Sequence, residues 1–272
     1  ERLKRQAAEA ELQRLRTEVA LQERLREVER LAEERGAALA RLATVHVIVI
    51  GIGGVGSWAA EALARSGVGR LTLVDLDHVA ESNFNRQLHA LEPTLGQAKV
   101  EAMRERIAQI HPACRVDVVD DFVSPDNWPG LLSERPDAVI DACDQVRAKQ
   151  AMAAWALREK MPFVCVGAAG GKRLAHKVDV DDLAHVTHDP LLAQLRYQLR
   201  KHHGAPKQGK RIGLRCVFSR EAVAGPDASC DIDGGDGSLN CHGYGSLVGV
   251  TATFGMCAAT EVMNMLVQSS KD

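Results

Sequence analysis

The chain has 272 residues, of which 46% are apolar and 26% are charged, a balance typical of soluble globular proteins. A domain takes roughly 100–200 residues, so this length fits one large domain with an additional segment. The formal net charge is −2 at pH 7, which excludes a global positive field that would draw the whole surface to nucleic acid. Any basic patch must therefore be local.

The seven cysteines are irregularly spaced, and no two of them form a C-x-x-C pair. Their number is odd and no signal peptide opens the chain, so we expect free thiols in a reducing cytoplasm. A four-cysteine zinc site lacks its usual spacing here.

Residues 1–35 contain no Gly or Pro and are dense in Glu, Arg, Leu and Ala, which are mostly strong helix formers. This composition predicts a long amphipathic helix that ends near Gly36. Its apolar stripes do not join into a heptad series, so a regular coiled coil is not predicted. We interpret residues 1–43 as a helical arm that is either solvated or used for dimerisation.

A strand–helix–strand unit follows the arm. Residues 45–50 form a β-branched run typical of a buried strand, residues 51–56 form a glycine-rich turn, and residues 57–66 are typical of a helix. Residues 71–74 predict a second strand that ends at Asp75. This order predicts a parallel, right-handed βαβ unit.

Further strands and helices alternate along the chain. Helices are predicted at 97–110 and 145–159, and strands at 115–119, 138–140 and 163–166. The pattern predicts an α/β fold with a Rossmann-like, doubly wound, mostly parallel sheet. We expect one domain over residues 44–268, with a core at 44–180 and an irregular C-terminal lobe at 181–268 that binds substrate or tRNA.

Residues 247–267 are largely apolar and about as long as the roughly 20 residues that span a bilayer. The segment contains Glu261, and a carboxylate in lipid is costly. We therefore predict a buried helix of the globular domain and no stable membrane insertion.

The glycine-rich turn follows a strand and opens a helix. Gly51, Gly53 and Gly56 form a G-x-G-x-x-G pattern, with Gly54 between them. Such a turn lets a phosphate approach backbone N–H groups at a helix N-terminus. Asp75, 19 residues after Gly56, is placed to accept hydrogen bonds from ribose hydroxyls. Taken alone, this fingerprint favours NAD.

The segment after the second predicted strand changes that interpretation. Arg86 and Lys99 add positive charge that a dinucleotide does not require, whereas a triphosphate needs its charge neutralised during attack on the α-phosphate. Asp77 is expected either to serve the triphosphate or to cap the loop. Asp141 and Asp144 follow the strand at 138–140, where a carboxylate can hold Mg²⁺.

Four sequence blocks, G-I-G-G-V-G, L-V-D-L-D, S-N-F-N-R-Q and V-I-D-A-C-D, together with Lys99, occur in this order. With them the chain resembles the superfamily of ubiquitin-activating enzymes and their bacterial sulfur-carrier-activating relatives. The resemblance implies that Arg86, Lys99 and Asp141 are catalytic and that Asp141 holds the metal ion of ATP·Mg²⁺. It implies ATP binding by Gly51, Gly53, Gly54, Gly56, Asp75, Asp77, Asn83, Arg86, Gln87, Lys99, Asp141 and Asp144.

Within this superfamily, further blocks such as D-P-L-L-A-Q-L-R and R-C-V-F-S-R-E resemble the branch of bacterial tRNA threonylcarbamoyladenosine dehydratases, over about residues 44–268. The resemblance implies ATP-dependent adenylation of the threonyl carboxylate in tRNA, followed by cyclisation with loss of AMP. It also implies a homodimer and a link to a cysteine desulfurase system. The alternative is adenylation of the C-terminal carboxylate of a ubiquitin-like sulfur-carrier protein.

Residues 190–220 contain no Asp or Glu and many basic residues. Lys and Arg neutralise nucleic-acid phosphates with little sequence readout. The residues predicted to bind tRNA are Arg196, Arg200, Lys201, Lys207, Lys210 and Arg211.

One feature of the chain differs from the family pattern, and the role of a second feature, Cys241, stays open. The branch carries an Arg-Phe-Gly-Gly-type motif whose arginine reaches the ATP of the partner subunit; this chain lacks the motif, although Arg26 lies at about that distance before Gly51. Cys241 matches a cysteine of the branch and is interpreted either as a sulfur relay or as a free surface thiol. Outside this superfamily, an NAD-dependent oxidoreductase and an inert scaffold stay open as alternatives.

Overall fold

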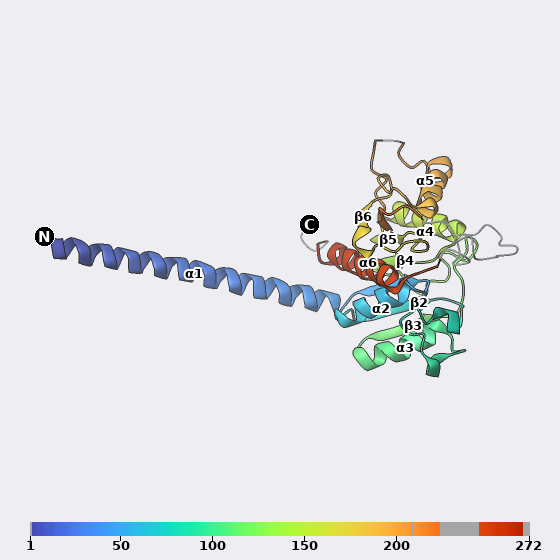
Figure 1. The fold of residues 1–272 in the computed structure, drawn as a ribbon, viewed down its shortest axis with the longest axis horizontal. Helices are drawn as coiled ribbons and strands as arrows, with labels where there is room; N and C mark the ends of the chain where they lie inside the picture. The colour runs from blue at the N-terminus through green and yellow to red at the C-terminus, as the bar shows by residue number, and fades with distance from the viewer. Residues whose placement is uncertain (1, 208, 224–244, 269–272) are drawn as a thin grey trace. The chain divides into compact units, whose positions relative to one another are not determined.

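The computed structural model describes residues 2–207, 209–223 and 245–268. The chain divides into two compact units, Glu1–Arg41 and Leu42–Asp272. Helix α1 (Arg2–Leu42) forms the first unit, and a sheet flanked by helices forms the second (Figure 1).

The sequence predicted that helix α1 ends near Gly36, but the helix continues to Leu42. A glycine inside a helix costs only about 1 kcal/mol relative to alanine. The residues that follow, Ala-Ala-Leu-Ala-Arg-Leu, are strong helix formers and outweigh that cost.

Seven strands form one sheet in the order β3-β2-β1-β4-β5-β7-β6. All neighbouring strands are parallel except β6 and β7, which are antiparallel. The predicted Rossmann-like, mostly parallel α/β fold is therefore confirmed. The strands are β1 (His46–Ile50), β2 (Arg70–Val74), β3 (Arg115–Val119), β4 (Ala138–Asp141), β5 (Phe163–Val166), β6 (Val178–Asp182) and β7 (Arg215–Ser219).

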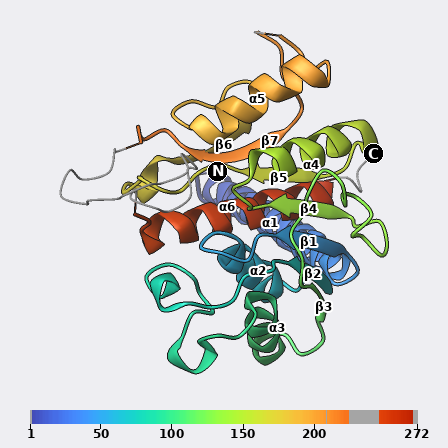
Figure 2. The same ribbon diagram turned by 90° about the vertical axis from the view of Figure 1, so that its right-hand side faces the viewer.

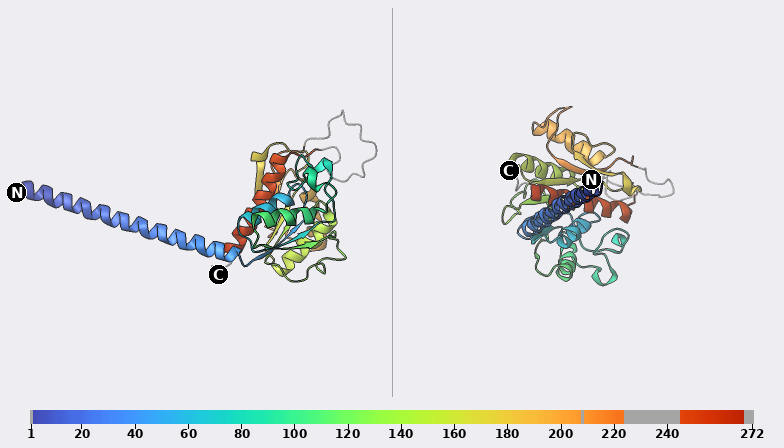
Figure 3. Two further views of the ribbon diagram at one scale, coloured as in Figure 1. Left: turned by 90° about the horizontal axis from the view of Figure 1, so that it is seen from below. Right: turned by 90° about the vertical axis from the view of Figure 1, so that its left-hand side faces the viewer.

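Helices cover both faces of this sheet (Figures 2 and 3). One face packs against α2 (Gly56–Arg65), α3 (Lys99–Ile110) and α6 (Val248–Gln268), and the other against α4 (Val146–Glu159) and α5 (Pro190–His202). Short 3-10 helices lie at Glu81–Asn83, Glu92–Thr94 and Ala175–Lys177. The two-sided cover explains why β1 is apolar from Val47 onward: Val47 and Val49 enter the first core, and Ile48 and Ile50 the second.

No structural boundary falls near residue 180 in the described chain. Strand β7 pairs with β5 of the expected core, and β6 pairs with β7, so both belong to the same sheet. Helix α6 packs on α2 and contacts β4, β5, β6 and β7. The C-terminal part thus completes the Rossmann-like sheet.

Among the described residues, α6 is the one helix whose length and hydropathy would allow it to cross a bilayer. Its buried side chains recur at helical spacing through Val250, Phe254, Ala258 and Val262 and enter the core of the sheet. The predicted buried helix is thus present.

Gly56 allows α2 to start directly against β1. A Cβ atom at this position would lie 1.8 Å from the carbonyl oxygen of Gly51. We expect Gly56→Ala to lower the free energy of unfolding by about 1–3 kcal/mol or more, because the backbone must shift. Gly249→Ala is the matched control, since nothing lies within 4 Å of its Cβ position. Urea unfolding of both variants measures the difference; equal stabilities would contradict the close approach.

Candidate active site

A pocket of about 630 Å³ opens at the carboxyl edge of the parallel strands. It is lined by residues that directly follow strands, among them Gly51 after β1, Asp75 after β2, Ala142 after β4 and Gly167 after β5. Strand order reverses between β1 and β4, the position where open α/β sheets bind ligands.

The glycine-rich turn forms one wall of this pocket. Gly51 has a positive φ of 84°, and Gly51, Gly53 and Gly54 line the pocket, as predicted for phosphate approach. Gly56 does not line it and serves helix packing instead. Ser57 joins the turn to the next segment, since its Oγ donates to the Gly53 carbonyl at 2.7 Å and accepts from the Leu88 N–H at 3.3 Å.

Asp75 lines the pocket and is held by backbone donors. Its Oδ2 accepts from the Ile52 N–H at 2.6 Å, and its Oδ1 accepts from the Asp77 N–H at 2.8 Å. Burial raises the pKa of the Asp75 carboxyl above its usual value, while the nearby Lys99 ammonium opposes that rise. The carboxylate therefore ties the glycine turn to the loop after β2, which is the expected position for a ribose ligand.

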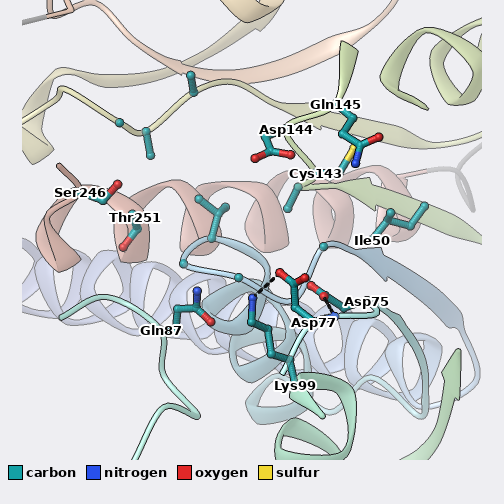
Figure 4. Close-up of a pocket in the computed structure, with 18 of the residues that line it drawn as sticks. Ile50, Asp75, Asp77, Gln87, Lys99, Cys143, Asp144, Gln145, Ser246 and Thr251 are labelled. Carbon is teal, nitrogen blue, oxygen red and sulfur yellow. Dashed lines mark hydrogen bonds and ion pairs between the residues drawn. The ribbon is translucent and has the colours of Figure 1, made fainter. Parts of the chain in front are cut away.

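Lys99 and Asp77 form an ion pair within the pocket, with 2.7 Å between Nζ and Oδ2 (Figure 4). The Lys99 side chain is 7% exposed and that of Asp77 is 54% exposed. Asp77 thus lines the pocket and pairs with the Lys99 ammonium, and that it serves the triphosphate stays a prediction.

Arg86, Asn83 and Gln87 also line the pocket, so the structure brings both predicted cations to the glycine turn. The Arg86 Nη1 donates to the Ser82 carbonyl at 2.8 Å, and the backbone carbonyl of Arg86 accepts from the Trp58 indole at 3.1 Å. Gln87 is 6% exposed and its buried Oε1 has no partner in the described part of the chain.

Asp141, predicted as a catalytic metal ligand, does not reach the pocket. Its side chain is fully buried and pairs with the equally buried Lys149, with 3.0 Å between Oδ1 and Nζ. Asp144 is exposed and lines the pocket, opposite Lys99 and Asp77 (Figure 4). The pleat explains this correction: Asp141 points to the same face as Val139, toward α4, and not along the sheet edge.

Several pocket residues were not predicted from the sequence. Cys143 and Gln145 accompany Asp144 after β4, Ser246 lies just before α6, and Thr251 lies in the first turn of α6 (Figure 4). The loop after β5, residues 167–170, was detectable, because small residues that directly follow a parallel strand lie at the carboxyl edge. Ser246 and Thr251 carried no such signal, since only tertiary packing brings α6 to this edge.

This geometry agrees with the comparisons with known proteins. The profile of the ThiF family matches residues 21–272. The chain belongs to the ThiF family. It is 46% identical over 238 residues to a tRNA threonylcarbamoyladenosine dehydratase from Escherichia coli K12, covering 85% of this chain and 89% of that relative. A Bacillus subtilis protein of the same name is 40% identical over 176 residues, covering 65% of this chain and 67% of the relative.

Solved structures agree with the sequence relatives. The crystal structure of the E. coli tRNA N6-threonylcarbamoyladenosine dehydratase in complex with ATP matches this ThiF-family protein with a TM-score of 0.78 and 45% identity. The match covers 86% of this chain and 90% of that one. The resemblance to the dehydratase branch is therefore confirmed. A crystal structure of E. coli MccB, at 14% identity and a TM-score of 0.56, shares the fold alone.

None of the six residues predicted to bind tRNA lines the pocket of this ThiF-family protein. Arg196 does not offer its charge freely, since its Nη1 donates to the carbonyls of Leu183 and Val186 at 2.9 Å each. Arg200 is partly buried and donates to the Pro206 carbonyl at 3.0 Å. These bonds give both residues a structural role, and their binding to tRNA stays a prediction.

The other four predicted tRNA-binding residues, Lys201, Lys207, Lys210 and Arg211, are exposed. Lys210 and Arg211 directly precede Ile212 and Gly213, whose N–H groups donate to Asp182. Asp182 pairs with Arg215 at the start of β7, so this part lies at the amino edge of the parallel strands, opposite the pocket. A ligand in the pocket would have to be large to reach Lys210 and Arg211 as well, and tRNA binding by all four residues stays a prediction.

Cys241 lies outside the described residues, so its role as a sulfur relay stays a prediction. The five described cysteines, Cys114, Cys143, Cys165, Cys216 and Cys257, are free thiols. Cys216 is buried in the core, as is typical of a packing cysteine.

His89 follows Arg86 and Gln87 in the loop between β2 and α3 and is 1% exposed. Neither ring nitrogen has a partner in the part of the chain that the structure describes. Burial, with help from Lys99 and Arg106, lowers the pKa of His89 to about 4, whereas an unfolded histidine titrates near 6.5.

This depressed pKa predicts that the protein loses stability in mild acid. Below pH 6.5 the imidazole of His89 binds a proton in the unfolded state, whereas in the folded state it binds one only near pH 4. The free energy of unfolding therefore falls as the pH decreases through this window. Between pH 7.5 and pH 5 the loss attributable to His89 is about 2 kcal/mol. Urea unfolding at both values should show a smaller difference in His89→Leu, while His202→Leu, at an exposed histidine, leaves it unchanged.

Proposed function

We propose that this protein uses ATP to adenylate the carboxylate of threonylcarbamoyladenosine in tRNA and then closes it to the cyclic form. One observation carries the proposal: a glycine-lined pocket brings the Lys99 ammonium, the Arg86 guanidinium and the Asp144 carboxylate around one space. This set fits a nucleoside triphosphate. The ATP complex of the E. coli dehydratase, at 45% identity, supports it.

The chemistry requires few protein groups. A carboxylate oxygen attacks the α-phosphorus, the bond to the bridging oxygen of the β-phosphate breaks, and pyrophosphate leaves with both electrons of that bond. The carbamoyl group then attacks the acyl carbon of the mixed anhydride, the bond from that carbon to the AMP oxygen breaks, and AMP leaves with both electrons of that bond. The carbamoyl N–H proton passes to solvent as the ring closes. Lys99 and Arg86 stabilise the charge that builds on the phosphoryl oxygens, and the glycine turn holds the nucleotide in line for attack.

The donor set of the pocket also fits Mg²⁺, with Asp144 in place of the predicted Asp141. Mg²⁺ is usually bound by one or two carboxylates together with substrate phosphates. The described residues hold no group of three or more His, Cys, Asp or Glu side chains able to bind a metal ion. Phosphate oxygens and waters would supply the other ligands of the ion. When bound, the ion would neutralise phosphate charge; Asp144 would hold it, and Asp77 pairs with Lys99.

The decisive experiment measures release of AMP and pyrophosphate with two matched tRNAs. Release is expected with tRNA that carries threonylcarbamoyladenosine and not with the same tRNA lacking the modification. Release that depends instead on a small protein ending in Gly-Gly would support activation of a sulfur carrier and contradict the proposal. Binding of NAD without ATP would contradict both.

We also propose that the protein works as a homodimer in the cytoplasm. Exposed apolar side chains occur on the loops between β2 and α3, at Phe84, Leu91 and Leu95, and on α6 at Val248 and Met256. Large apolar side chains gathered at a surface are typical of an association face. Light scattering of the purified protein should give twice the chain mass. A link to a cysteine desulfurase stays a prediction.

A further inference from the structure

A buried ion pair lies behind the pocket between Lys149 of α4 and Asp141 of β4. Both side chains are 0% exposed, and neither lines the pocket. On average, a buried ion pair stabilises a fold no better than apolar side chains of the same volume, because both charges lose their hydration. Stability alone therefore does not explain this pair.

The Lys149 ammonium joins the ends of two neighbouring strands. It donates to the Asp141 Oδ1 at 3.0 Å and to the Val166 carbonyl at 2.7 Å, and lies 3.3 Å from the Asp141 carbonyl. The pairing of β4 with β5 ends at Asp141 and Cys165. Lys149 thus bridges the two strands where their pairing in the sheet ends.

The Asp141 carboxylate shapes the loop that carries Asp144. Its Oδ1 accepts from the Cys143 N–H at 3.2 Å and from the Cys143 thiol at 3.0 Å. These bonds turn the chain directly after β4, so that Asp144 and Gln145 face the pocket before α4 begins. The charge of Lys149 holds the carboxylate in this position.

The Val166 carbonyl precedes the second loop, residues 167–170, which lines the pocket. The far side of that loop is held by Asp189, whose Oδ2 accepts from the Ala168 N–H at 2.9 Å. A Cβ atom at Gly167 would lie 2.0 Å from the same Oδ2, so this loop is tightly confined. Lys149 fixes its start and Asp189 its continuation.

We propose that Lys149 is a positioning residue for the triphosphate site, which acts with Asp141 by holding the Asp144 loop and the 167–170 loop at a fixed separation. The inference rests on the proposed function in one respect, that the pocket binds ATP. Its physical basis is preorganisation: a site whose supports are locked loses less freedom when the ligand binds.

The test uses two variants and a binding measurement. Lys149→Met leaves the Asp141 charge buried without a partner and is expected to lower Tm strongly. Lys149→Met with Asp141→Asn buries no charge and is expected to recover most of that loss. In this double variant the Kd for ATP with Mg²⁺, measured by calorimetry, should still rise by about 10–100-fold, the usual effect of losing a support behind a metal ligand.

Coupling to Asp144 separates positioning from plain stability. In the parent protein Asp144→Ala should weaken ATP binding clearly; in the double variant it should weaken it by only about twofold, because Asp144 is already displaced. The control is Glu61→Gln with Arg106→Met, which removes another buried carboxylate and its partly exposed partner, 2.8 Å apart and away from the pocket. It should change Tm but preserve the full effect of Asp144→Ala.

The outcomes are distinct. A double variant that binds ATP as the parent does, or that keeps the full Asp144→Ala effect, overturns the positioning role and leaves Lys149 as a fold-stabilising residue. A parent protein that binds no ATP overturns the proposed function together with this inference.

Discussion

Replacing Lys99 with alanine is expected to lower the rate of pyrophosphate release by about 10²- to 10³-fold, the usual cost of losing one preorganised stabilising group. The Lys99 ammonium lies in the pocket, nearly buried and oriented by Asp77. Its place at the first residue of α3 opposes the helix dipole, which favours negative charge there. The position therefore costs the helix stability and indicates a role for the charge in the site.

Stability should respond little to the same change. Because one partner of the Lys99–Asp77 pair is more than half exposed, the pair contributes only about 0–1 kcal/mol. Arg104→Ala, on the same helix and paired with Glu101 at the surface, is the matched control and should leave turnover unchanged. A loss of activity in Lys99→Ala that merely follows its loss of Tm would contradict the role in phosphoryl transfer.

The two aspartates after β4 should respond in opposite ways to replacement by alanine. Asp144→Ala removes an exposed pocket carboxylate, so we expect a fall in turnover of at least about 10²-fold and little change in Tm. Asp141→Ala leaves the Lys149 ammonium buried without its counter-charge, which is expected to cost about 3–5 kcal/mol of stability. Burial alone disfavours the ammonium, but Asp141 raises the pKa of Lys149 above its usual value, so the charge persists.

Two measurements check this pair of expectations. Thermal unfolding should rank Asp141→Ala far below the parent and Asp144→Ala beside it. Titration with Mg²⁺ at fixed ATP should show a weaker response in Asp144→Ala than in the parent. If Asp144→Ala keeps the Mg²⁺ response of the parent, another residue holds the ion.

The sequence by itself determined the local units of this fold. Strands β3 and β5 were predicted at their observed bounds, and β1, β2 and β4 within one residue, because β-branched runs bounded by turn residues encode strands locally. The pocket-lining glycines, Asp75 and Lys99 were identifiable for the same reason, since each directly follows a strand or opens a helix. Parallel strands bring such positions to one edge whatever the rest of the chain does.

Tertiary structure alone decided the features that join distant parts of the chain. The insertion of β7 beside β5, the approach of Thr251 to the pocket and the use of Arg196 to hold two carbonyls all depend on packing between segments far apart in sequence. Asp141 and Asp144 look alike in sequence, three residues apart at the end of one strand. Only the packing of α4 against the sheet places Lys149 beside the first and leaves the second in the pocket, because the Lys149 charge offsets the cost of burying the Asp141 carboxylate.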